Sequence, residues 1–172
     1  TRISWELHLA LSHSPTSYSI MKIRPIVQVD IPSLKVILDN TGLFPSEMLE
    51  DMISDYLANP DSTDIWFTVE VDGQPISIAY CAPERMTEGT YNLYAIAVHG
   101  NQQGRGVGAQ MMEYIENLLR DQGHRILIVE TSGLADYDLT REFYRKCQYT
   151  EEATIREFYA EGEDKVVFWK KL

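Results

Sequence analysis

Three glycines between residues 103 and 109 form the most informative pattern of the sequence. Gly104, Gly106 and Gly108 alternate with other residues, after an apolar stretch and before an amphipathic one. Glycine lets the backbone approach an anion closely, and the first amides of a helix lack intrahelical acceptors. The positive end of the helix dipole favours negative charge at the same place. The spacing therefore predicts a loop between a strand and a helix that binds a phosphate or pyrophosphate group.

A dinucleotide is one ligand that carries such a group. Gly104, Gly106 and Ala109 have the spacing of the dinucleotide fingerprint, and Glu130 ends the next expected strand, where a ribose-binding acid would lie. Five residues, however, separate the preceding strand from Gly104, whereas the fingerprint places its first glycine close after the strand. About forty residues follow Glu130 and end in an antiparallel pair, too few for the second half of a doubly wound sheet. The sequence therefore argues against a dinucleotide.

The glycine loop needs a strand before it and a helix after it, and hydrophobic periodicity predicts both. Residues 91–98 are typical of a strand, and an apolar stripe from Val107 to Leu118 lies on one face of a helix that Gly123 ends. An apolar strand over 125–131 and a short helix over 138–147 follow. The other expected elements are strands over 21–27, 65–71, 75–80, 150–158 and 165–171, and helices over 30–42 and 45–59.

The order of these elements, βααβββαβαββ, predicts an α/β (α+β) fold with a mixed, mostly antiparallel central sheet flanked by helices. We expect residues 21–172 to form a single domain. Residues 1–20 precede the first methionine, Met21, and are expected to be a non-native or upstream extension. Their apolar stretch is too short for a membrane anchor, and Glu6 lies where a secretory signal carries positive charge.

Two motifs of the chain resemble the GNAT superfamily of N-acetyltransferases. Gln103-x-x-Gly106-x-Gly108 is similar to the family signature (Arg/Gln)-x-x-Gly-x-(Gly/Ala), and the strand before it ends Ile96-Ala97-Val98 as in that family. Residues 140–146 resemble the family's short helix that ends in a Phe-Tyr pair. The resemblance extends over the element order from residue 21 to residue 172, and it implies the GNAT-like acyl-CoA N-acyltransferase fold.

The resemblance implies a binding site for acetyl-CoA as cosubstrate and no metal. The loop amides would bind the coenzyme A pyrophosphate, with Gln103 bracing the loop. The backbone of Ile96 and Val98 would pair with the pantetheine arm, which requires the sheet to open at this edge. An amide near Ala97 would polarise the thioester oxygen. The loop residues with this implied role are Gly104, Arg105, Gly106, Val107, Gly108 and Ala109.

The implied reaction is transfer of an acetyl group to a primary amine by direct attack in a ternary complex. Tyr144 matches the family's general-acid tyrosine and would protonate the coenzyme A sulfur. Glu130 resembles the carboxylate that some members use as a base through water, and a structural ion pair is the other interpretation of this residue. The chain departs from the family at Gln148, where a glycine is usual, and in lacking an asparagine between Glu130 and Tyr144. A non-catalytic, regulatory acetyl-CoA-binding module is the alternative function.

The composition of the chain argues against some classes of binding partner. The 172 residues carry a formal net charge of −11, which argues against nucleic acid as the main partner. The two cysteines have no metal-ligand spacing and are typical of reduced thiols in a cytoplasmic protein. The sequence leaves a homodimer open and predicts no membrane association.

The charge is unevenly distributed along the chain. Residues 36–84 contain ten acidic residues and no lysine or arginine. We expect this stretch on the acceptor side of the fold, flanked by Trp66, Tyr91 and Tyr94, where it would attract a cationic amine. The expected acceptor is a small amine or a peptide amino group; a solvated acidic face is the other interpretation of the stretch.

Overall fold

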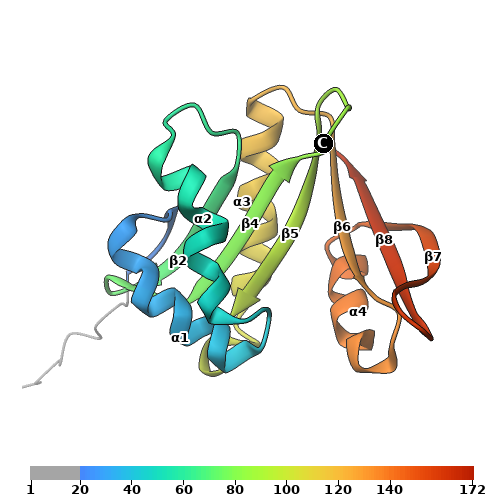
Figure 1. The fold of residues 1–172 in the computed structure, drawn as a ribbon, viewed down its shortest axis with the longest axis horizontal. Helices are drawn as coiled ribbons and strands as arrows, with labels where there is room; N and C mark the ends of the chain where they lie inside the picture. Colours follow the sequence, from blue (N-terminus) through green and yellow to red (C-terminus); the bar gives the residue numbers. More distant parts are fainter. Residues whose placement is uncertain (1–19) are drawn as a thin grey trace, which may run out of the picture.

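The computed structural model describes residues 20–172, so the predicted extension lies outside the described residues except for Ile20. The elements follow the predicted order (Figure 1). The strands are β1 (Met21–Pro25), β2 (Ile65–Val71), β3 (Gln74–Pro75), β4 (Ser77–Pro83), β5 (Thr90–Val98), β6 (Ile126–Ser132), β7 (Thr150–Ala160) and β8 (Glu163–Lys171). The longer helices are α1 (Ile31–Thr41), α2 (Leu49–Ala58), α3 (Val107–Asp121) and α4 (Asp138–Lys146).

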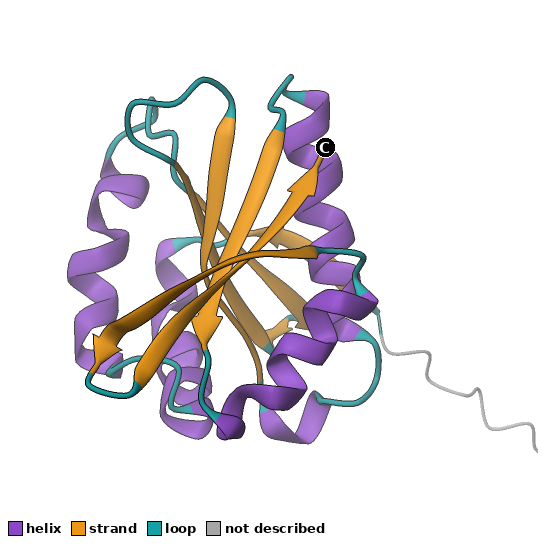
Figure 2. Cartoon of the chain, turned by 90° about the vertical axis from the view of Figure 1, so that its right-hand side faces the viewer, coloured by secondary structure: helices purple, strands orange, loops and turns teal. Residues whose placement is uncertain are grey.

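The strands form one mixed sheet in the order β1-β2-β4-β5-β6-β8-β7, with β3 paired to β2. Among the described strands, β5 and β6 are the parallel pair, and every other pairing is antiparallel. Helices cover both faces of the sheet (Figure 2). The predicted mixed, mostly antiparallel sheet flanked by helices is therefore confirmed.

Each face of the sheet has its own hydrophobic core. Met111 and Ile115 of α3 pack with Tyr144 of α4 against one face. Leu34 of α1 and Ile53 of α2 pack against the other. The helices thus bury the apolar stripes that their sequences predict.

The sheet opens between β5 and β6. The two strands pair only from Thr90 to Leu93 and from Ile126 to Val129, and beyond these residues they diverge toward the lower side of Figure 1. A β-bulge accompanies the divergence, because Tyr80 of β4 pairs with Ala95 whereas Cys81 pairs with Leu93, which leaves Tyr94 as the extra residue. The second half of β5 therefore has a partner on the β4 side and a free edge toward β6, as the sequence predicts.

Candidate active site

The loop before α3 presents a row of unpaired backbone amides. Gly104 and Gly106 adopt left-handed conformations, with φ of +73° and +78°, that place residues 104–109 around the start of α3. Within residues 20–172, none of these six amides donates a hydrogen bond to a backbone carbonyl or a side chain. The first turn of α3 carries no acidic side chain that would neutralise the helix dipole. The loop therefore has the donors and the field that an anion needs.

Gln103 fixes this loop to the end of β5. Its Nε2 donates to the carbonyl oxygen of Val98 at 2.8 Å. At the other end of the loop, Gly108 faces α4, where an added Cβ would lie 3.2 Å from Cζ of Phe143. The glycine thus lets α3 approach α4 closely, and the two helices together position the loop.

The free edge of β5 offers backbone groups to a ligand. His99 donates its amide to Ile76 on the β4 side, whereas the Val98 carbonyl accepts from Gln103 instead. Because backbone groups alternate along a strand, the amides of Ile96 and Val98 point into the opening and that of Ala97 points toward β4. The donors near Ala97 that could reach a thioester oxygen therefore belong to its two neighbours.

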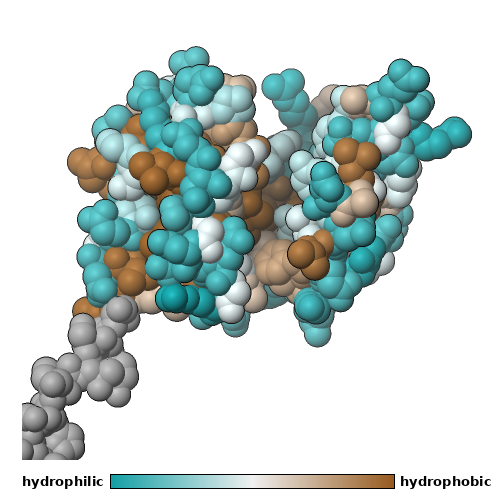
Figure 3. Space-filling model, turned by 90° about the horizontal axis from the view of Figure 1, so that it is seen from below, coloured by the Kyte–Doolittle hydropathy of each residue, from teal (hydrophilic) through white to brown (hydrophobic). Residues whose placement is uncertain are grey.

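A cavity of about 370 Å³ lies where β5 and β6 separate. Seen from below, the molecule is hollowed between the part formed by α1 and α2 and the part formed by α4, β7 and β8 (Figure 3). Glu130 of β6 and Tyr144 of α4 both line this cavity, together with Ile96 of β5. The structure thus brings the two predicted catalytic side chains to the free edge of β5.

Tyr144 is held by aromatic packing. Its side chain is buried, and its ring lies 5.3 Å from that of Phe143 and 5.4 Å from that of Phe168. Within the described residues its hydroxyl has no hydrogen-bond partner, although Tyr144 lines the cavity. Burial raises the pKa of Tyr144 well above its usual value, so the hydroxyl carries its proton at neutral pH. A protonated phenol beside a cavity is suited to donate a proton.

Glu130 is half-buried and forms an ion pair. Its Oε1 lies 3.2 Å from Nζ of Lys165 on β8. The same ammonium group lies 3.7 Å from the centre of the Phe158 ring. The structural ion pair that the sequence leaves open is therefore present, and the carboxylate also lines the cavity.

Two of the three aromatic residues predicted to flank the acceptor lie away from the cavity. Trp66 is fully buried against α1 and α2, stacked on Tyr80 at 4.2 Å, and cannot flank a ligand. Tyr91 packs on the α3 face, where its hydroxyl donates to the Thr63 carbonyl. Of the three predicted aromatic residues, Tyr94 alone lines the cavity.

The acidic stretch lies beside the cavity but does not supply its lining carboxylates. From residues 36–84, only Leu43 lines the cavity, whereas the acidic side chains of the stretch do not. Tyr137, Tyr159, Glu163 and Lys165 surround the site instead. Because they come from a turn and the β7–β8 hairpin, whose register is not visible in local sequence, no motif could have identified them.

The end of α4 keeps its usual shape without the glycine of the family pattern. Gln148 takes the left-handed conformation with φ of +66°. The amides of Gln148 and Tyr149 donate to the carbonyls of Arg145 and Tyr144. This cap costs roughly 1 kcal/mol relative to glycine and preserves the position of Tyr144.

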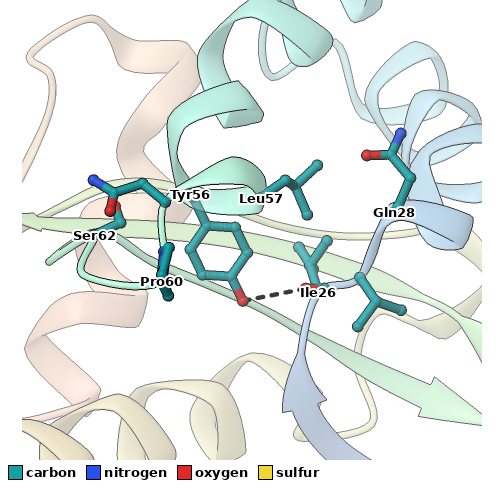
Figure 4. Close-up of a pocket in the computed structure, with 8 residues that line it drawn as sticks. Ile26, Gln28, Tyr56, Leu57, Pro60 and Ser62 are labelled. Carbon is teal, nitrogen blue, oxygen red and sulfur yellow. Dashed lines mark hydrogen bonds between the residues drawn. The ribbon is translucent and has the colours of Figure 1, made fainter.

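A second hollow, of about 390 Å³, lies between the end of α2 and the turn after β1 (Figure 4). Among the described residues, its lining carries no acidic or basic side chain. The hydroxyl of Tyr56 donates to the carbonyls of Ile26 at 3.1 Å and Trp66 at 3.3 Å, so this group is already engaged. The hollow therefore offers no free group for acid–base chemistry.

No group of three or more His, Cys, Asp or Glu side chains within residues 20–172 is placed to hold a metal ion. In the same part of the chain, no helix is long and apolar enough to cross a membrane.

Comparison with known proteins identifies the family. The profile of the Acetyltransferase (GNAT) family matches residues 34–149. An uncharacterised N-acetyltransferase of Methanocaldococcus jannaschii is 24% identical over 109 residues, which are 62% of this chain and 65% of that relative. The match thus spans slightly less than two thirds of the relative's length.

Solved structures share the fold. A crystal structure described as a GNAT-family acetyltransferase of Desulfovibrio desulfuricans is 27% identical, with a TM-score of 0.83 over 88% of this chain and 99% of its own. An aminoglycoside 6'-N-acetyltransferase complexed with coenzyme A is 14% identical, with a TM-score of 0.70 over 87% of this chain and 96% of its own. The family profile covers more than half of the sequence, and the chain therefore belongs to the GNAT family of acetyltransferases.

Proposed function

We propose that the chain transfers an acetyl group from acetyl-CoA to a primary amine, by direct attack within a ternary complex. The observation that carries the proposal is the opening between β5 and β6, with a free strand edge that leads into a loop of unpaired amides. Membership of the GNAT family supports acetyl-CoA as the donor. The solved relative with bound coenzyme A has the same fold.

The residues fit coenzyme A in two places. The amides of residues 104–109 match a pyrophosphate in charge and hydrogen bonding, with Gln103 holding the loop in position. The free edge at Ile96 and Val98 matches the amide groups of the pantetheine arm, which can pair as an added strand. Ile96 belongs to the lining of the cavity, so a thioester at the end of the pantetheine arm would lie near Glu130 and Tyr144.

The reaction needs three proton movements, because the nitrogen of the ammonium ion loses two protons and the leaving thiolate gains one. The amine nitrogen forms a bond to the thioester carbonyl carbon, the carbon–sulfur bond breaks, and the thiolate takes a proton from the Tyr144 hydroxyl. An alkyl ammonium with a pKa of about 10 is not nucleophilic, so it must lose its first proton before the attack. The second proton leaves the nitrogen as the amide forms and restores the Tyr144 hydroxyl through solvent. Glu130 would accept the first proton through water at Oε2, since Lys165 is paired with Oε1.

Positioning supplies the rest of the acceleration. An amide of the β5 edge would donate to the carbonyl oxygen, where negative charge develops. Holding both substrates in one cavity converts a bimolecular reaction into an effectively intramolecular one. A non-catalytic acetyl-CoA-binding module would need the same loop but not Tyr144.

The test is an incubation with acetyl-CoA and a panel of primary amines. Free thiol is followed in solution, and the products are identified by mass spectrometry. We expect thiol release that depends on the amine and an equal amount of N-acetylated product. Saturable binding of acetyl-CoA with no amine-dependent thiol release would establish the binding module instead, and absence of acetyl-CoA binding would overturn both functions.

A further inference from the structure

The cavity between β5 and β6 is rimmed by three tyrosines from separate elements. Tyr94 comes from the bulge of β5, Tyr137 from the turn before α4, and Tyr159 from the end of β7. Each is partly exposed, at 51%, 42% and 45% respectively, although large aromatic side chains are usually buried. The three rings therefore remain available to a ligand in the cavity.

Carboxylates face the same space. Glu130 and Glu163 line the cavity. Lys165 lies beside the lining and is paired with Glu130, so Glu163 is the carboxylate that remains for a ligand. Burial and then these two carboxylates raise the pKa of Tyr159, so the acids lie within electrostatic range of its ring. An acidic acceptor would be repelled here, whereas a cation would be attracted.

The Tyr94 ring is held in place before any ligand arrives. Its hydroxyl donates to Oε1 of Glu84 at 2.9 Å, and the buried Asn92 donates to the same oxygen at 2.7 Å. On its other side the ring stacks on Tyr80, with centroids 5.6 Å apart. A ring fixed in this way loses little conformational entropy when it contacts a ligand.

The ammonium group of Lys165 beside this cavity is already bound by a carboxylate and an aromatic ring. Nζ of Lys165 lies between the Glu130 carboxylate, at 3.2 Å, and the Phe158 ring, at 3.7 Å from its centre. A carboxylate paired with an aromatic face is how proteins recognise alkyl ammonium ions. In the same cavity, Glu163 lies within electrostatic range of the Tyr159 ring, and Tyr94 and Tyr137 are part of the same lining.

We propose that the acceptor binds in this cavity as an alkylammonium ion, against the rings of Tyr94, Tyr137 and Tyr159 and the carboxylate of Glu163. The proposal rests on the proposed function, because it names the substrate class of the same site. A volume of about 370 Å³ lies at the small end of ligand pockets, so the acceptor is a small amine or the end of a longer chain.

The test uses a pair of probes that differ in charge and little in shape. Choline carries a permanent cation and no primary amine, and 3,3-dimethylbutan-1-ol is its uncharged analogue. Binding of each is measured by calorimetry at constant ionic strength. We expect choline to bind about tenfold more tightly than the neutral analogue, because only the cation gains from the ring faces and the carboxylate.

Two variants show whether the rings are responsible. Tyr159→Leu removes the ring and should weaken choline binding about fivefold, whereas Tyr159→Phe retains the ring and should bind choline as the unchanged protein does. Equal affinity for choline and its neutral analogue, or unchanged choline binding by Tyr159→Leu, would overturn the proposal.

Acetyl-CoA affinity, measured in the same samples, separates this proposal from the function on which it rests. Choline binding without acetyl-CoA binding would leave the cation site standing and remove the proposed function. Acetylation of amines, with choline bound no more tightly than its neutral analogue, would remove the cation site and leave the proposed function standing.

Discussion

Replacement of Tyr144 by phenylalanine isolates the hydroxyl group that is proposed to protonate the leaving thiolate. The ring is buried between Phe143 and Phe168, and phenylalanine fills the same volume. Within residues 20–172 the hydroxyl makes no hydrogen bond that the substitution could break. Only the proton donor is lost.

The substitution should have a small effect on stability and a large effect on turnover. Because the hydroxyl borders the cavity and has no partner among the described residues, its removal should change the free energy of unfolding by less than about 1 kcal/mol. Loss of a general acid lowers turnover about 10²- to 10⁴-fold. The affinity for acetyl-CoA should stay the same, because the contacts of the coenzyme lie on the loop and on β5.

Tyr149→Phe is the matched control. Tyr149 is equally buried and lies 6.2 Å from the Tyr144 ring, but its hydroxyl donates to Glu116 at 2.9 Å. This variant should lose about 1–3 kcal/mol of stability and keep its turnover. Thiol release from acetyl-CoA and thermal unfolding are measured for both variants. Unchanged turnover in Tyr144→Phe would refute the assignment, as would an equal loss of turnover in the control.

Three further outcomes follow from the structure. Gly106→Ala places a Cβ at a left-handed position that has open space around it. We expect the free energy of unfolding to fall by about 1–2 kcal/mol, measured by calorimetry, and acetyl-CoA to bind about tenfold more weakly. Unchanged affinity would remove the loop from the coenzyme site. Glu116→Ala removes the buried carboxylate that lies 2.8 Å from Nζ of Lys170 and 2.9 Å from the hydroxyl of Tyr149. The free energy of unfolding in denaturant should fall by about 3 kcal/mol, and a change below about 1 kcal/mol would contradict this. Burial raises the pKa of Tyr144 and Tyr149 above the unfolded value of about 10, so the unfolded chain loses these protons first as the pH rises. The free energy of unfolding should therefore be full below about pH 10 and decline above it. Unfolding midpoints that stay constant from pH 9 to 11 would contradict the burial argument.

Local sequence signals predicted most of the fold. The glycines at 104 and 106 lie in a loop between β5 and α3, as their spacing predicts. Hydrophobic periodicity located the helices and strands to within a few residues, because each element buries one face. The resemblance to the family also predicted the opening beside Ile96 and Val98.

The walls of the cavity could not be predicted, because they depend on contacts between distant strands. A single bulge at Tyr94 shifts the alternation of β5, so Ile96 and Val98 face the same side of the sheet as Tyr91. Lys165 meets Glu130 only through the register of β6 with β8. Neither feature leaves a local pattern in the sequence.

Initial rates measured while acetyl-CoA and the best amine are both varied test the central claim most directly. Direct attack in a ternary complex predicts that the double-reciprocal lines for thiol release intersect and that no thiol is released without amine. Parallel lines would indicate an acetylated enzyme intermediate and contradict the account, as would release that does not depend on the amine.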